Sequence, residues 1–431
     1  TLIALVVTIV VLLILAGVTI SLLLDENGII KKSKEGRREY ETSKTNEQEQ
    51  MDNAEDWIDE AVTGKKSNVV KSFKEAKTEN STIDGKKEGN ANNPTIPAGY
   101  IPINTETSNW GNGKDAPSQD SVDHGLVIKD DKDNEWVWIP VPDVTVMCDT
   151  SNTTEYTLCG TTGETAVKTK LYSKSEIISG ITRTTPGTTD PSIREPDLLV
   201  DDNGASYDAK EECYKTILGE TGTKEQLAQL FVDEYKEMIE SISKYEGFYI
   251  GRYELTGTVV DPTEKTGKTL TNTGWYNLYN ACRNSKLQAS DKVKTQMIWG
   301  CQWDVTMNWL ISSGAKTRDE VNGDSSSWGN YYSVSVKADD GITEIKESNE
   351  DKLLNTGETT FTMANNIYDL AGNCYERTQE AYSPYNRVYR GGACQSDYSA
   401  SDGSWTEDFG PDVGSSNDRN SSRFNNKVIR V

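Results

Sequence analysis

Side chains that commonly carry out catalysis or bind metals are few in this sequence. It contains a single histidine, His124, and seven cysteines, none of them spaced as C-x-x-C. Because zinc sites need clustered cysteine and histidine ligands, this set predicts no zinc site. Ser-His-Asp catalysis would depend on His124 alone, and no G-x-S-x-G elbow lies near it. We expect His124 to lie in a surface loop.

One close group of carboxylates consists of Asp130, Asp131 and Asp133 in the segment DDKDN. Paired carboxylates can serve as general acid and base. Aspartate and asparagine also favour tight turns, and this segment lies between two strand-like apolar segments, GLVIKD and EWVWIPVP. The pattern therefore favours a polar hairpin turn over a catalytic pair.

The overall charge limits the class of partner. The chain of 431 residues has 45 Lys and Arg against 68 Asp and Glu, a net charge of −23. Nucleic acids are bound through clustered Lys and Arg, so we predict no nucleic-acid partner. High negative charge fits a secreted surface protein that stays soluble at high local density.

The first 24 residues, TLIALVVTIVVLLILAGVTISLLL, contain no charged residue and no proline. As a helix they would extend about 36 Å, enough to cross a bilayer core of about 30 Å. The chain starts at Thr1, not methionine, which we interpret as removal of a leader. The basic cluster in 31–38 would by itself hold the following domain in the cytoplasm. A removed leader with its own basic residues would resolve this conflict with export. The alternative is a simple membrane anchor.

This segment, continued through DENGI, resembles the mature N-terminus of type IV pilin-like proteins. In that family a prepilin peptidase cuts just before it, and the helix waits in the membrane until the assembly machinery packs it into a filament. The resemblance implies a helical homopolymer with Thr1, Leu5, Ile9, Leu13 and Gly17 in the filament core. The family's usual glutamate at the fifth position is Leu5 here, so the amine of Thr1 needs another partner.

The rest of the chain changes character several times. The charged, proline-free stretch after the apolar run extends the predicted helix over residues 1–63. Residues 64–93 are polar and rich in Gly, Asn and Lys, which predicts a linker. Apolar spacing predicts an amphipathic helix over 223–245 and a shorter one near 302–312. Residues 143–220, rich in Thr, Asp and Gly, predict a long irregular insertion.

Five segments of the C-terminal region follow one another as GFYIGRYE, GCQWDVTMNWL, SWGNY, NNIYDLAGNCYERT and RVYRGGACQSDY. In that order they resemble the formylglycine-generating-enzyme (sulfatase-modifying factor) domain, a variant of the C-type lectin fold, over residues 94–431. The resemblance implies an α+β chain, with a long N-terminal pilin-type helix followed by a loop-rich C-type-lectin-like domain. Short strands, two helices and many glycines are compatible with it.

The resembled enzymes need two cysteines just after the GG-containing motif, where the thiolates bind copper. The corresponding positions fall at about Ser396 and Ser401, and Cys394 alone cannot form a two-sulfur site. We therefore expect no enzymatic activity.

The same family builds a calcium site on the segment that reads DLAGNCYE here. Carried over by position, the ligands would be the carboxylates of Asp369 and Glu376 and the carbonyls of Gly372 and Cys374, oxygen ligands that suit Ca²⁺. The alternative is a polar turn held by its own hydrogen bonds. The resembled fold also places the strands carrying Cys374 and Cys394 side by side, which implies a disulfide between them.

For an exported protein, paired cysteines are the default. Cys148 and Cys159 lie in a Thr- and Asn-rich stretch typical of a hairpin tip, which predicts that they pair. Cys282 and Cys301 are a further candidate pair. Because the cysteine count is odd, at least one thiol is left over, and Cys213 is our candidate.

A ligand-facing surface is predicted in residues 395–423. This segment is packed with Ser, Asp, Asn and Gly and also contains Tyr398, Trp405 and Phe409. Rigid aromatic rings among small polar groups are typical of binding surfaces. In the resembled fold the segment lies between the GG-containing strand and the last strand. The alternative is a solvated loop.

Together these patterns predict a pilin of an extracellular type IV-like filament, in the membrane before assembly and on the cell surface afterwards. Its domain would bind a surface protein or a glycan. The alternative is a monomeric membrane-anchored receptor or adhesin carrying the same non-catalytic domain.

Overall fold

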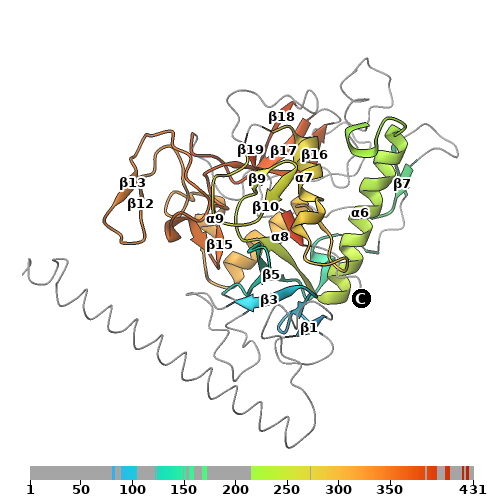
Figure 1. Cartoon of the computed structure of the whole chain (residues 1–431), viewed down its shortest axis with the longest axis horizontal. Helices are drawn as coiled ribbons and strands as arrows, with labels where there is room; N and C mark the ends of the chain where they lie inside the picture. Colours follow the sequence, from blue (N-terminus) through green and yellow to red (C-terminus); the bar gives the residue numbers. More distant parts are fainter. Residues whose placement is uncertain are drawn as a thin grey trace, which may run out of the picture. The chain divides into compact units, whose positions relative to one another are not determined.

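The computed structural model describes residues 80–82, 89–103, 122, 124–148, 150–151, 155–159, 167–171, 215–271, 273–383, 386–395, 403–407, 420–421 and 424–426 (Figure 1). The predicted helix over 1–63, with all five predicted filament-core residues, lies outside this part of the chain, as do Cys213, Tyr398 and Phe409. Within the part described, no helix has the length and apolar content needed to cross a membrane.

A six-stranded antiparallel sheet lies at the centre of the described unit. Its strands, in spatial order, are β11 (Thr295–Met297), β20 (Phe424–Asn426), β8 (Gly247–Gly251), β5 (Glu135–Pro140), β4 (Val127–Asp130) and β3 (Tyr100–Ile103). The strands predicted around Val127 and Trp138 are β4 and β5, so this prediction is confirmed.

Both faces of this sheet are buried, and the residues alternate between two separate apolar clusters. Opposite each other across β5 and β8, Trp138 and Tyr249 belong to the first cluster, whereas Val137 and Ile250 belong to the second. Since successive side chains of a strand point to opposite faces, each strand contributes to both clusters. This explains why the sequence EWVWIP is apolar at four consecutive positions.

The amphipathic helix predicted over 223–245 is α6 (Lys224–Tyr245). It begins with a capping box, in which the Thr223 hydroxyl accepts from the backbone of Gln226 and the Gln226 side chain accepts from the backbone of Thr223. At about 1.5 Å per residue its 22 residues extend about 33 Å, which is long enough to contact both clusters. Leu227 and Phe231 pack in the first cluster, and Met238 and other residues of the C-terminal half pack in the second.

Two further helices cover the sheet. Helix α8 (Gly300–Ser312) confirms the prediction near 302–312 and packs in the second cluster. Helix α7 (Trp275–Cys282), which the sequence analysis did not predict, packs in the first. It is held by aromatic contacts: Trp275 stacks on Tyr279 at 5.2 Å between ring centroids and meets Phe231 edge-on at 5.9 Å.

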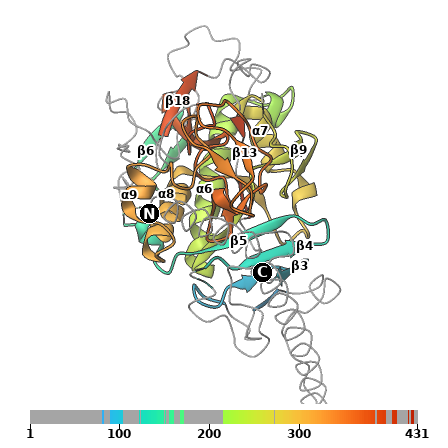
Figure 2. The ribbon, with the colours of Figure 1, turned by 90° about the vertical axis from the view of Figure 1, so that its left-hand side faces the viewer.

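A four-stranded sheet and several two-stranded ribbons complete the architecture. The four-stranded sheet has the order β18 (Gly403–Glu407), β17 (Asn386–Arg390), β16 (Tyr375–Ser383) and β19 (Asn420–Ser421), with only β16 and β19 parallel. The ribbons are β1–β2 (Ser81–Thr82, Thr95–Ile96), β6–β7 (Tyr156–Cys159, Val167–Thr169), β9–β10 (Thr256–Thr258, Asp261–Thr263), β12–β13 (Val336–Lys337, Glu344–Lys346) and β14–β15 (Met363–Ala364, Ile367–Tyr368). Short helical segments are η1 (Val144–Val146), η2 (Ser285–Leu287), α9 (Arg318–Asn322) and η3 (Thr360–Thr362). Strands β18 and β3 lie at opposite ends of the unit in both views (Figures 1 and 2).

The unit thus belongs to the α+β class, as predicted, with mostly small antiparallel sheets. Two boundaries need correction. Part of the predicted linker 64–93 belongs to the fold, because Ser81 and Thr82 pair with β2 and the Trp138 indole donates to the carbonyl of Ala91 at 3.0 Å. The predicted irregular insertion 143–220 contains the β6–β7 hairpin. Sequence periodicity missed both because these strands are only two to four residues long.

Candidate functional site

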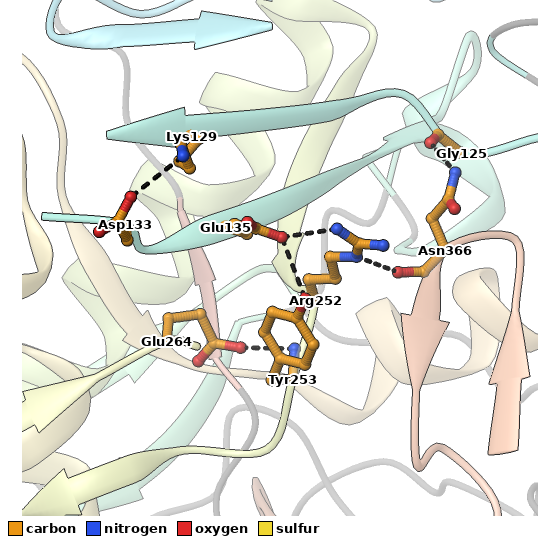
Figure 3. A network of polar contacts seen from close by, with 8 residues as sticks. All are labelled: Gly125, Lys129, Asp133, Glu135, Arg252, Tyr253, Glu264 and Asn366. Carbon is orange, nitrogen blue, oxygen red and sulfur yellow. Dashed lines mark hydrogen bonds and ion pairs between the residues drawn. The ribbon is translucent and has the colours of Figure 1, made fainter. Parts of the chain in front are cut away.

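A polar network surrounds Arg252, which directly follows β8 (Figure 3). Its guanidinium donates to Glu135 Oε2 at 2.6 Å and to the carbonyl of Asn366 at 3.1 Å. The guanidinium carbon lies 5.4 Å from the ring centroids of both Tyr253 and Tyr368, which stack on each other at 5.3 Å. Arg252 thereby joins β5, β8 and the β14–β15 ribbon.

In this network the Tyr253 phenol donates a hydrogen bond, and the Tyr368 phenol accepts one from the Arg252 side chain. Burial raises the pKa of Tyr253 and of Tyr368, and desolvation is the largest cause in both. Both rings are therefore protonated near neutral pH, and the Tyr253 hydroxyl donates to Glu135 Oε2 at 3.1 Å. These contacts tie the segment after β8 to Glu135 of β5.

The DDKDN segment forms the polar hairpin turn between β4 and β5 that the sequence favoured. Buried Asp130 accepts hydrogen bonds from the backbone of Lys132 and Asn134 and from the Asn134 amide. Burial raises the pKa of the Asp130 carboxyl, although these hydrogen bonds oppose the shift. Asp133 pairs with Lys129 at 3.0 Å (Figure 3). His124 is exposed in a turn, as predicted.

The predicted calcium ligands lie in a buried polar turn. The carboxylate of Asp369 accepts from the hydroxyl of Thr356 at 2.8 Å and from the backbone of Gly357 at 3.2 Å, so the fold already uses it. The described residues contain no group of three or more His, Cys, Asp or Glu side chains that could hold a metal ion. The calcium site of Asp369, Gly372, Cys374 and Glu376 stays a prediction, because its ligand set combines two carboxylates with two backbone carbonyls.

Neighbouring Glu254 shows what holds this turn together. Its buried carboxylate accepts from the Thr269 hydroxyl at 2.6 Å, the Asn373 amide at 2.7 Å and the backbone of Cys374 at 3.1 Å. Asn373 in turn accepts from the Asn330 amide at 2.8 Å. The alternative interpretation of DLAGNCYE, a turn held by hydrogen bonds, describes this geometry.

Five buried cysteines are thiols, which corrects the predicted disulfides: Cys148, Cys282, Cys301, Cys374 and Cys394. Cys282 packs in the first apolar cluster and Cys301 in the second, on opposite faces of the central sheet, so they cannot pair. Buried Cys148 is a thiol in the second cluster and is not joined to Cys159 of β6.

The predicted Cys374–Cys394 disulfide is likewise not formed, although the two segments are adjacent. The backbone of Cys394 donates to the carbonyl of Asn373 at 3.0 Å, which agrees with the predicted proximity. The Cys394 sulfur, however, lies 3.5 Å from Asp351 Oδ1, and both cysteines are thiols.

Only part of the predicted ligand-facing surface 395–423 is described. Trp405 lies in β18, where its backbone pairs with Val388 of β17. Tyr398 and Phe409 lie outside the described residues, as do Ser396 and Ser401.

A pocket of about 590 Å³ lies beside α8, and we call it the α8 pocket. One wall is a face of that helix, formed by Val305, Asn308, Trp309 and Ser312. These positions follow the i, i+3, i+4, i+7 spacing of one helix face, so the signal for this wall was present in the sequence.

The opposite walls of the α8 pocket come from three other segments. Pro140 is the last residue of β5, Pro142 follows the strand, and Val146 of η1 is 51% exposed. Glu246, the left-handed residue that ends α6, accepts from the backbone of Ala91 at 3.1 Å and so ties the turn at 90–92 to the pocket. The sequence analysis did not predict this site because these segments are far apart in the chain.

Comparisons with known proteins assign no family: no protein-family model, curated protein or solved structure matches the chain. Its function is therefore inferred from its sequence patterns and from the geometry above.

Proposed function

We propose that this protein is a structural subunit of an extracellular type IV pilus-like filament and that it displays a C-type-lectin-like domain, similar to formylglycine-generating-enzyme domains, for adhesion. The observation that carries the proposal is the uncharged, proline-free run of 24 residues with its pilin-like pattern, placed ahead of a folded α+β domain. A prepilin peptidase and an assembly machinery would process the chain and polymerise it.

Filament assembly would follow from burial of the apolar run against copies of itself. Apolar surface removed from water contributes about 25 cal/mol per Å². In the membrane the same helix would be solvated by lipid, so extraction into a filament exchanges one apolar environment for another. The domain would remain outside, where its net negative charge keeps neighbouring copies soluble.

The domain's role in this proposal is binding without catalysis. Ser396 and Ser401 stand near the positions where the resembled enzymes have cysteines, so the copper-binding thiolate pair is missing from the sequence. The α8 pocket and the predicted surface 395–423 are two candidate places for a ligand.

A second candidate function, a monomeric membrane-anchored receptor, is favoured by one residue. Leu5 replaces the glutamate that pilin-like proteins usually carry, and with it one expected contact between subunits. The receptor would keep the helix in the membrane permanently.

Electron microscopy of material sheared from cells that express the full chain tests the proposal. The test variant is Ile9→Asp, since a carboxylate within an apolar membrane helix costs about 2.5–3.5 kcal/mol or more. The matched control is Ile342→Asp, because Ile342 of the described domain is 82% exposed. We expect filaments from the wild type and from the control, and none from Ile9→Asp.

The result that would overturn the proposal is equally direct. Wild-type cells that carry the protein in the membrane fraction but shed no filaments would favour the receptor. Normal filaments from Ile9→Asp would show that this helix is not the filament core.

A further inference from the structure

We infer that the α8 pocket binds a neutral saccharide. The inference rests on the proposed function for its setting, since it supplies the displayed domain with a ligand class, but the binding itself does not require assembly.

The size and position of the pocket suit a small ligand. Its volume of about 590 Å³ lies within the range of about 300–1,000 Å³ that is usual for small-molecule sites. The exposed side chain of Val146 and the two prolines at and after the end of β5 supply an apolar surface. Such a surface suits the C–H face of a sugar ring.

The charges of the pocket exclude anionic ligands. Among the described lining residues, Glu246 is the one ionisable side chain, and no Lys, Arg or His accompanies it. A carboxylate, sulfate or phosphate on the ligand would be desolvated beside this carboxylate without a compensating cation, which is unfavourable. The chain's net charge of −23 adds to the repulsion.

A cationic ligand would find the carboxylate of Glu246 in this pocket but no open aromatic face. A cation bound by cation–π interaction needs the open face of a ring, and Trp309 is only 5% exposed. Its indole N–H is buried and has no acceptor among the described residues, so it is shielded in this conformation. The accessible polar groups include the amides of Asn92 and Asn308 and the carboxylate of Glu246, together with the exposed side chains of Asn90 and Ser312.

Those amides match hydroxyl groups. An asparagine side chain both donates and accepts, as a hydroxyl does, and a carboxylate accepts from hydroxyls. The side chains of Asn92 and Asn308 make no hydrogen bond within the described part of the chain, so a ligand would not have to displace a protein contact. Peptide ligands present fewer such groups, and the two classes are separated by the test below.

The pocket is also rigid before any ligand arrives. The Asn90 side chain accepts from the backbone of Asn92 at 2.9 Å, which fixes the turn. Ala91 is held on both sides, its backbone N–H by Glu246 and its carbonyl by the indole of Trp138. A preformed site loses less conformational entropy on binding, which favours affinity for small ligands.

Saturation-transfer NMR on the full-length protein tests the inference. The protein is kept in a polyoxyethylene detergent, because detergents with sugar headgroups would compete. The probes are glucose, galactose, mannose, N-acetylglucosamine, lactose and cellobiose, with glucuronic acid as the anionic comparison and octaproline as the peptide comparison. Hits are titrated by calorimetry.

Asn308→Leu, which removes the amide at similar size, should weaken binding of a neutral sugar about tenfold. The matched control is Asn355→Leu, because Asn355 is exposed, makes no side-chain hydrogen bond within the described residues and lies outside the pocket. It should bind as the wild type does. Asn92→Ala, in an exposed turn, provides a second test should Asn308→Leu alter the melting temperature. Glu246→Gln should reduce the discrimination against glucuronic acid.

Three results would overturn the inference: no transfer to any neutral sugar, transfer to octaproline alone, or sugar binding unchanged in both asparagine variants. Measuring sugar binding in Ile9→Asp as well separates the two proposals. Sugar binding without filaments in the wild type would refute the filament alone, and filaments without sugar binding would refute the saccharide site alone.

Discussion

Replacing Arg390 by methionine tests how the four-stranded sheet is joined to α8. Arg390 of β17 is fully buried and donates to Glu380 of β16 through two bonds, from Nε to Oε2 at 2.8 Å and from Nη2 to Oε1 at 2.5 Å. Asp304 of α8 lies 3.6 Å from the same guanidinium, within ion-pair range but too far for a hydrogen bond. Arg390→Met keeps a long apolar stem and leaves two buried carboxylates without their cation.

The burial of all three groups sets the size of the effect. The exposed side-chain fractions are 0% for Arg390 and Glu380 and 2% for Asp304, so water cannot replace the lost cation. Removing one partner of such a buried pair costs about 3–5 kcal/mol of unfolding free energy.

Urea denaturation of the full-length protein in micelles, followed by tryptophan fluorescence, measures the loss. The matched control is Arg283→Met: the Arg283 side chain is 31% exposed, lies 2.9 Å from Glu234 and stacks over Tyr279. Because solvent screens this pair, the control should lose only about 1–2 kcal/mol.

A double variant, Arg390→Met with Glu380→Met, completes the test. It should be more stable than Arg390→Met alone, because one of the two stranded carboxylates is gone. The reasoning is refuted if Arg390→Met loses no more stability than the Arg283 control, or if the double variant is less stable than the single one.

Two other predictions concern the backbone and the thiols. Gly125 has φ +86°, and a Cβ added there would meet the carbonyl oxygen of Asn365 at 2.0 Å, whereas Gly219 has φ +85° with nothing within 4 Å. In urea denaturation, Gly219→Ala should lose about 1 kcal/mol of unfolding free energy to left-handed strain. Gly125→Ala should lose clearly more, because the added Cβ also meets the Asn365 carbonyl. Equal losses in the two variants would contradict this close contact. Cys148, Cys282, Cys301, Cys374 and Cys394 are buried thiols, so in the unreduced protein they should react with iodoacetamide slowly when it is native and completely when it is denatured. A Cys374–Cys394 peptide found by non-reducing mapping would contradict this.

Local patterns in the sequence determined several elements of this fold. The boundaries of α6 follow from its threonine cap and from apolar residues at helical spacing, because both act within one or two turns. The β4–β5 hairpin follows from two apolar runs on either side of aspartates and asparagine that suit a tight turn. The predicted helix over 1–63 lies outside the described residues and stays a prediction.

The tertiary structure alone decided how distant segments meet. Cys282 and Cys301 are close in sequence, yet the central sheet separates them, because alternate strand residues divide the core into two clusters. The carboxylate of Asp369 accepts hydrogen bonds from the loop at 356–357, a contact that no local pattern in the sequence indicates. The α8 pocket needs a helix face, the end of a strand and a turn more than 200 residues before that helix. Periodicity and capping report on near neighbours in the chain, whereas burial, pairing and pocket shape depend on contacts that only folding creates.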